Sequence, residues 1–263
     1  MTTVVSASRQ LDDAGDRLDA TVEFASEIFA VVDILARERG LRRSLSDTSS
    51  EAKARQRLVD AVFGSKVSAD CKELLDATTT CTWRSPVALT RALERQGVRA
   101  VLRRAQQADR LETVADELFG INRLVRGQAS LQMAIADPNR SGQDRQELLT
   151  TLVGDRVGED TLLLARRAVV SSEASFEHVV DGYLGIASEL AERKRAIVTT
   201  ARALTDAQRA EMVKQLERIT GSPIELSEIV DPAVLGGALI NLGDEVIDST
   251  VAHRLDQARQ ELG

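Results

Sequence analysis

Apolar residues recur at alternating steps of three and four along the first part of the chain, and this spacing predicts a long amphipathic helix. The stripe consists of Leu11, Ala14, Leu18, Thr21, Ala25, Ile28, Val32 and Leu35. Side chains at these intervals share one helix face, so most of the stripe is expected to pack in a core. Any part that the core leaves uncovered would form a groove for a partner helix.

Polar caps and helix breakers predict several shorter helices after this stripe. Thr48-x-x-Glu51 has the spacing of a capping box and predicts a helix over 51–63. Two further helices are predicted to begin at Ser68, which can act as a cap, and at Pro86, which suits a first helical turn.

The same pattern returns 90 residues later, which indicates an internal duplication. Segments 41–70 and 131–160 align without a gap and keep apolar residues, aspartates and glycines at matching positions. Matching pairs include Leu41 and Leu131, Leu45 and Ile135, Asp47 and Asp137, Arg55 and Arg145, Gly64 and Gly154, and Phe29 and Phe119. We therefore predict two tandem helical bundles, 1–105 and 106–195.

From Ala196 onward the chain becomes β-branched and alternating, which predicts strands. A capping box, Thr205-x-x-Gln208, opens a helix between a first strand and a second strand over 224–229. The remaining predicted elements are a strand over 234–240 that contains Gly236 and Gly237, a turn at Gly243-Asp244, a short strand at Val246-Ile247 and a helix over 250–262. The predicted fold is mainly α, with two tandem bundles followed by a small C-terminal α/β domain at 196–263.

The C-terminal segment also carries a long set of anchor residues. They are Ile224, Leu226, Val230, Asp231, Val234, Gly236, Gly237, Ile240, Asn241, Gly243 and Asp244. With these anchors the chain resembles the delta subunits of the bacterial rotary (F-type) ATP synthase, the family that includes the oligomycin-sensitivity-conferring protein (OSCP). Ser249 stands where the family more often has glycine, and serine there can cap the final helix. The resemblance covers the whole chain, with one helical bundle more than usual.

The resemblance implies a non-catalytic peripheral-stalk subunit, present in one copy per complex. Such a subunit binds the N-terminal helices of the alpha subunits and the end of subunit b, so that the catalytic head does not rotate with the rotor during proton-driven ATP synthesis. It implies a peripheral location at the cytoplasmic face of the bacterial plasma membrane. Some enlarged family members are fused behind a membrane-anchored stalk helix, and this chain is expected to be the form without that anchor.

Composition narrows the classes of function further. The 263 residues are 43% hydrophobic but only 3% aromatic, which favours helices packed through small and aliphatic side chains. The net charge of −7 argues against nucleic-acid binding. No apolar run approaches the roughly 20 residues of a membrane span, and the acidic N-terminus does not resemble a signal peptide. Cys71 and Cys81 fit no disulfide or zinc pattern, which predicts a reducing compartment.

The sequence predicts no catalytic, cofactor-binding or metal-binding residues. Its two histidines, His178 and His253, lack neighbours at the spacing of a zinc site. The glycines of the C-terminal segment match neither GxGxxG nor GxxxxGK[ST], so a structural role is expected. Two other classes stay open. An enzyme would need a small-molecule pocket beside Gly236-Gly237, and an adaptor unrelated to ATP synthase would explain the duplication but not the anchors.

Two sets of residues are candidate docking surfaces. The apolar set is Leu11, Leu18, Ala25 and Val32, and the basic set is Arg91, Arg95, Arg99 and Arg103. Arginines at every fourth position line one helix face, where like charges repel unless acids neutralise them. We favour a solvent-exposed face paired with nearby Asp and Glu. The alternatives are a docking surface for an acidic partner helix and, more remotely, a nucleic-acid site.

Overall fold

A computed structural model gives the fold and describes residues 7–171, 174–191, 194–220, 224–232, 234, 237–242 and 245–248. The chain forms two compact units, Met1–Leu190 and Ala191–Gly263, and each has its own hydrophobic core. The first unit is helical, and the second combines a helix with a small mixed sheet. The predicted fold class is confirmed.

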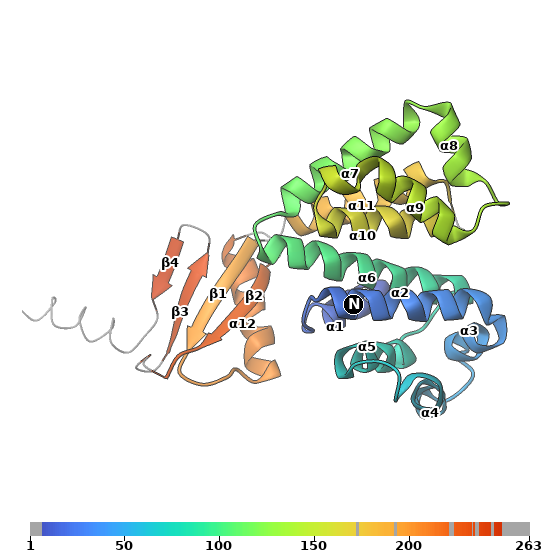
Figure 1. Cartoon of the computed structure of the whole chain (residues 1–263). Helices are drawn as coiled ribbons and strands as arrows, with labels where there is room; N and C mark the ends of the chain where they lie inside the picture. The colour runs from blue at the N-terminus through green and yellow to red at the C-terminus, as the bar shows by residue number, and fades with distance from the viewer. Residues whose placement is uncertain are drawn as a thin grey trace, which may run out of the picture. The chain divides into compact units, whose positions relative to one another are not determined.

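The helical unit is built from short and medium helices arranged on both sides of one long helix, α6 (Figure 1). They are α1 (Ala7–Gly15), α2 (Val22–Arg37), α3 (Arg39–Ser46), α4 (Ala52–Phe63), α5 (Ala69–Thr80), α6 (Pro86–Gln107), α7 (Leu111–Arg126), α8 (Ala129–Ala136), α9 (Gly142–Val153), the 3-10 turn η1 (Gly154–Arg156), α10 (Glu159–Val170) and α11 (Phe176–Ala191). We call α1–α5 the first set and α7–α11 the second set. In the described part of the chain, no helix combines the length and the apolarity that crossing a membrane requires.

The duplication is visible in the helix boundaries. Both ends of α3, α4 and α5 recur 90 residues later as the ends of α8, α9 and α10, and α6 and α11 begin at the same spacing. Ninety residues after α1 comes 97–105, which is the second half of α6. The helix α6 therefore closes the first set and opens the second, and it packs against α1, α2 and α3 as well as α7 and α10. The predicted boundary after residue 105 falls inside this helix.

The long N-terminal helix that the apolar stripe predicted is broken in two, so that prediction was wrong. Gly15 ends α1, and a turn leads to Thr21, whose side chain accepts a hydrogen bond from Phe24 N at 3.1 Å and caps α2. Thr21 occupies a stripe position, but it serves as a cap because its hydroxyl satisfies an unpaired amide of the new helix.

The predicted capping box at Thr48 is also wrong. Asp47 Oδ1 accepts the Ser49 N–H at 2.9 Å, which turns the chain before a helix can begin. The N-cap of α4 is Glu51, and its side chain makes no cap hydrogen bond. The predictions at Ser68 and Pro86 are confirmed, because Ser68 Oγ accepts Cys71 N at 3.2 Å and Pro86 occupies the first turn of α6.

The described residues of the second unit form four strands in the order β2-β1-β3-β4. These are β1 (Lys194–Thr200), β2 (Ile224–Val230), β3 (Ala238–Leu242) and β4 (Glu245–Asp248), with α12 (Asp206–Thr220) between β1 and β2. The strands β1 and β2 are parallel, whereas β3 pairs antiparallel with β1 and β4. Alternate residues of β1, Ala196 and Val198, are fully buried in the core, to which Leu216 of α12 also contributes.

The predicted elements of this unit are largely present. The capping box at α12 is confirmed, because Thr205 and Gln208 exchange hydrogen bonds of 3.0 and 3.3 Å. The strand predicted over 234–240 begins later, at Ala238. Gly237 directly precedes it with φ of 83°, a left-handed conformation that favours glycine. The predicted helix over 250–262 lies outside the described residues.

Candidate docking surfaces

Three of the four arginines at every fourth position of α6 contact the short helix α1 and the turn after it. Asp12 on α1 and Asp16 just after it have the same spacing as the arginines opposite. Arg99 Nη2 lies 2.6 Å from Asp16 Oδ1, and Arg95 Nη2 lies 3.2 Å from Asp12 Oδ2. We call Arg95, Arg99 and Arg103 the arginine ladder. The acids offset the repulsion between like charges and join α1 to α6.

Arg103 extends the ladder mainly through backbone oxygen atoms. Its two terminal nitrogens donate to Gly15 O and Asp16 O, both at 2.8 Å. Carbonyl groups at a helix end lack their usual partners, so the guanidinium caps the end of α1. Only 1% of Arg99 and 5% of Arg103 is exposed. The ladder is therefore buried at Arg99 and Arg103 and partly exposed at Arg95, and it is not the solvent-exposed face that the sequence predicted.

Both predicted docking sets take part in internal packing. At most 8% of Leu11, Leu18, Ala25 or Val32 is exposed, so these are core residues and not the floor of an open groove. Three of the four predicted arginines form the ladder. The fourth, Arg91, is exposed and also takes part in an interaction within the molecule. Contact of either set with another protein stays a prediction.

An arginine anchor occurs in both sets at the 90-residue spacing. Arg55 Nε donates to Thr79 O at 3.1 Å, and Arg145 Nη1 donates to Val169 O at 3.3 Å. Each arginine binds a carbonyl group at the end of the helix packed beside it, so the anchor is structural. The duplication aligns the two arginines but does not reveal their partners.

A glutamate anchor is duplicated in the same way. Ser68 N donates to Glu27 Oε2 at 3.0 Å, and Gly158 N donates to Glu117 Oε2 at 2.9 Å. The carboxylates thus accept hydrogen bonds from amide groups at the starts of α5 and α10, where negative charge is favourable. Sequence analysis missed this pair, although identical acids 90 residues apart were a usable signal.

One arginine joins the two sets across their interface. Arg167 of α10 binds Glu94 of α6 through two nitrogens, with Nη2 2.6 Å from Oε2, and its Nη1 lies 2.7 Å from Asp33 Oδ1 of α2. The guanidinium also lies 4.9 Å from the ring centre of Phe29, and Tyr183 of α11 donates to Glu94 Oε1 at 3.1 Å. We call these five residues the interset lock.

Electrostatics fixes the charge state of the lock. Burial alone would lower the pKa of Arg167, but the hydrogen bonds and charges of Glu94 and Asp33 outweigh it and raise this pKa above its ordinary value. Burial, and then the charge of Glu94, holds the pKa of Tyr183 well above its usual range. The arginine is therefore charged and the tyrosine neutral throughout the physiological pH range.

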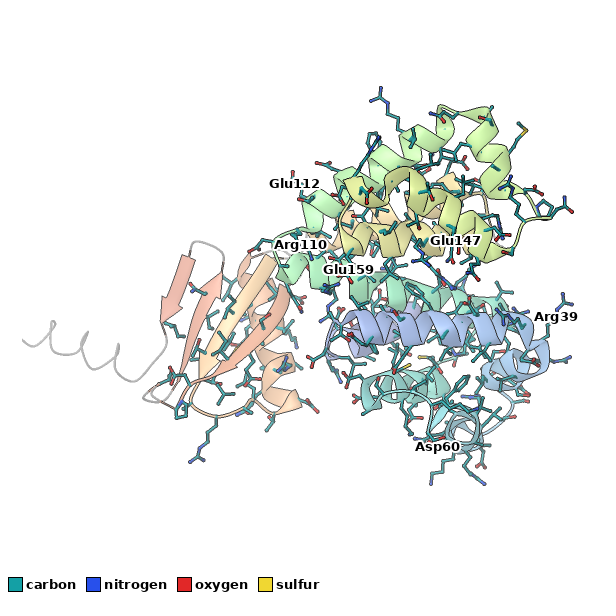
Figure 2. All side chains as sticks on the ribbon, viewed as in Figure 1. Arg39, Asp60, Arg110, Glu112, Glu147 and Glu159 are labelled. Atoms are coloured by element: carbon teal, nitrogen blue, oxygen red, sulfur yellow. The ribbon has the colours of Figure 1, made fainter. Side chains whose placement is uncertain are left out.

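A second joint holds the start of α10. Asp160 is fully buried, and its two oxygens lie 2.7 Å from Arg104 Nη1 of α6 and 2.7 Å from Arg110 Nη2. Figure 2 labels Arg110 and also Glu159, the residue before Asp160, at this end of α10. Two arginines on one buried carboxylate satisfy both of its oxygens, as a buried charge requires.

The described anchor residues of the C-terminal segment lie in the strands of the second unit or next to them. Ile224 and Ile240 lie in its core, and Leu226 packs against that core. At the end of β2, Val230 is half exposed and Asp231 N donates to Thr200 O at 2.8 Å. Val234 N donates to Asp231 O at 3.1 Å, and Asn241 is exposed on β3. Gly236, Gly243 and Asp244 lie outside the described residues.

Comparison of the sequence with known proteins shows the family to which the chain belongs. The family model described as "ATP synthase delta (OSCP) subunit" matches residues 94–262. A protein of Cutibacterium acnes named ATP synthase subunit delta is 77% identical over 263 residues, which is 100% of both chains. The chain belongs to the ATP synthase delta (OSCP) subunit family. Proteins of the same name from Nocardioides sp. and Streptomyces coelicolor are 35% and 34% identical, covering 94% and 97% of this chain and 90% and 97% of theirs.

The ATP synthase delta (OSCP) match begins inside α6, at residue 94. It starts just before the stretch 97–105 that lies 90 residues after α1. The matched region therefore contains the second half of α6, the whole second set and the second unit. Among the described residues, no group of His, Cys, Asp and Glu side chains is arranged to hold a metal ion.

Proposed function

We propose that this chain is a non-catalytic stator subunit of the F-type ATP synthase, which tethers the catalytic alpha/beta head to subunit b of the peripheral stalk. The observation that carries the proposal is the 77% identity, over the full length of both chains, to a protein named ATP synthase subunit delta. Without a tether the head would turn with the rotor during proton-driven synthesis. The subunit must therefore stay bound to the head and to subunit b while torque acts on the head.

We further propose a division of this work along the chain. One of the helical bundles at 1–105 and 106–195 binds N-terminal helices of the alpha subunits, and the domain at 196–263 binds the end of subunit b. One copy serves each complex, at the cytoplasmic face of the bacterial plasma membrane. Amphipathic helices that bind in grooves bury enough apolar area for slow dissociation, which suits a tether. The interset lock supports the idea, because it makes the two helix sets resist separation.

The test is a tagged pull-down from solubilised native membranes, with every co-purifying protein identified by mass. We expect alpha, beta and b subunits, with one copy of this chain per complex. Recovery of none of them by a folded protein with an accessible tag would contradict the proposal. The chain would then be better described as a helical adaptor that shares the family fold.

A further inference from the structure

A groove lies where α2 of the first set meets α9 and α10 of the second set. We propose that it is the docking site for an acidic amphipathic helix from another subunit of the same complex. This inference rests on the proposed function, since it takes the partner from the ATP synthase. The groove has a volume of about 720 Å³. Neither helix set could form it alone, because each supplies only one wall.

The groove offers apolar surface to a partner. Ala30 is exposed, and Leu163 and Val170 are half buried, so their methyl groups remain available for contact. Phe29 and Arg167 also line the groove, and both belong to the interset lock. The lock therefore fixes the separation of the walls before a partner arrives, which reduces the entropy lost on binding.

The positive charge of the groove favours an acidic partner. Its lining contains four arginines and one aspartate, in a chain whose net charge is −7. Asp33 is already bound to Arg167, and Arg145 donates to backbone carbonyl groups. Arg37 and Arg166 are exposed, and neither has an ion pair with any residue that the structure describes. The side chains of Arg37 and Arg166 are therefore available to bind carboxylates of the partner.

The two arginines occupy opposite walls, since Arg37 ends α2 and Arg166 lies on α10. An amphipathic helix matches this arrangement, because it carries an apolar stripe that can lie along the groove and carboxylates on both margins of the stripe. A small anion would neutralise the arginines but leave the apolar surface in water. The geometry therefore favours a helix with acidic residues flanking its apolar face.

The experiment is photocrosslinking in the intact ATP synthase. A benzoylphenylalanine replaces Gln143, an exposed residue that lines the groove, and a control probe replaces Ser130, which is exposed on α8 outside it. We expect the probe at Gln143, and not the one at Ser130, to crosslink to a segment of another subunit with an apolar stripe flanked by Asp or Glu. A crosslink to a segment without carboxylates, or no crosslink at all, would overturn the inference.

Charge reversal tests the role of the arginines directly. In the presence of the Gln143 probe, Arg37→Glu with Arg166→Glu should lower the crosslinking yield about tenfold or more. The matched control is Arg39→Glu with Arg156→Glu, which makes the same change in net charge at two exposed positions outside the groove lining; Arg39 is labelled in Figure 2. Circular dichroism of both double variants verifies folding. An equal yield in the two double variants would refute docking through Arg37 and Arg166.

The outcomes separate this inference from the proposed function. Failure of the unmodified chain to co-purify with alpha, beta and b subunits would refute the stator assignment. Normal co-purification without a groove crosslink would refute only the docking site. Binding of inorganic phosphate by the isolated chain, lost in Arg37→Glu with Arg166→Glu and accompanied by no crosslink in the complex, would assign the groove to a small anion instead.

Discussion

A buried guanidinium needs charge partners, and Arg99 depends on two carboxylates although its Nε and Nη1 have no hydrogen-bond partner among the described residues. Only 1% of the residue is exposed, and its nearest carboxylates are Asp16 at 2.6 Å and Asp12 at 3.5 Å. Removing one partner of a buried pair costs more than the pair itself contributes, because the remaining charge stays in a low-dielectric surrounding. The ladder is therefore sensitive to loss of its acids.

We expect Asp16→Ala to lower the free energy of unfolding by about 2–3 kcal/mol, somewhat less than for a fully isolated charge because Asp12 remains near Arg99. Urea unfolding followed by Trp83 fluorescence measures this change. The control is Asp19→Ala, an exposed residue in the same turn, which should change stability by less than about 0.5 kcal/mol. Equal losses in the two variants would show that the ladder adds nothing to stability.

The two thiols give a second prediction at this scale. Burial, assisted by the charge of Glu27, raises the pKa of Cys71 to about 12, and burial also raises the pKa of Cys81. The reactive thiolate is then scarce in the native protein. We expect iodoacetamide at about pH 8 to modify neither cysteine in the folded chain and both in urea, as measured by mass spectrometry. Rapid native labelling of Cys71 would contradict the packing around α5.

Residue-level prediction from the sequence succeeded for the apolar stripe and only in part for the arginines. The stripe spacing correctly identified apolar side chains such as Leu11 and Val32 as able to pack in a core. The arginine spacing correctly suggested pairing with acids, yet placed the pairs in solvent. Asp12 and Arg95 are far apart in sequence, so only tertiary structure brings them together and buries them.

Helix starts and ends follow local chemistry, and the elements were therefore the most predictable level. Ser68, Pro86 and Thr205 mark true starts, because a cap or a first-turn proline acts within a few residues. The prediction at Thr48 failed because Asp47 accepts the Ser49 N–H and turns the chain there, so that the helix begins only after Glu51. Thr21 fitted the apolar stripe and so concealed the break between α1 and α2.

Comparing equivalent helices predicts a stabilising substitution. The N-cap of α9, Ser141, makes a full capping box with Asp144, whereas its counterpart in α4, Glu51, makes no side-chain cap. We expect Glu51→Ser to raise the free energy of unfolding by about 0.5–1 kcal/mol, measured by urea unfolding. Thr48→Ala is the control and should have little effect. A clear loss of stability in that control would mean that Thr48 is the cap after all.

At the scale of the molecule, the duplication could be read from the sequence, but the way its copies join could not. Periodicity identifies each helix, whereas the sharing of α6 depends on which faces of it are covered, and those faces are fixed by long-range contacts such as Arg167 with Glu94. The groove between the sets was unpredictable for the same reason, since its two walls come from distant parts of the chain.

The single tryptophan and the single tyrosine report on different sets, since buried Trp83 precedes α6 and Tyr183 lies on α11. Because the sets share α6 and the lock, we expect Trp83 fluorescence and tyrosine second-derivative absorbance to give the same urea midpoint. Arg167→Ala, which leaves Glu94 without its buried partner, should cost about 3 kcal/mol and separate the midpoints.

The neighbouring substitution Arg166→Ala serves as the control, because Arg166 is exposed and lies outside the lock. Its two midpoints should remain coincident. Separate midpoints in the unsubstituted chain would show that the two sets unfold independently despite the shared helix.

Because α6 belongs to both repeats, the helical unit resembles a very short solenoid. In such arrays each internal unit needs neighbours on both sides, and the ends need special pieces that stop growth. The nine-residue α1 holds the position in the first repeat that the second half of α6 holds in the second repeat. At the other end, α11 begins at the position equivalent to the start of α6 but has 16 residues, whereas α6 has 22. It is therefore too short to supply the first helix of a third repeat, and the chain continues to β1. The length of one helix thus sets the number of repeats, and extending α11 is the natural place to add a third.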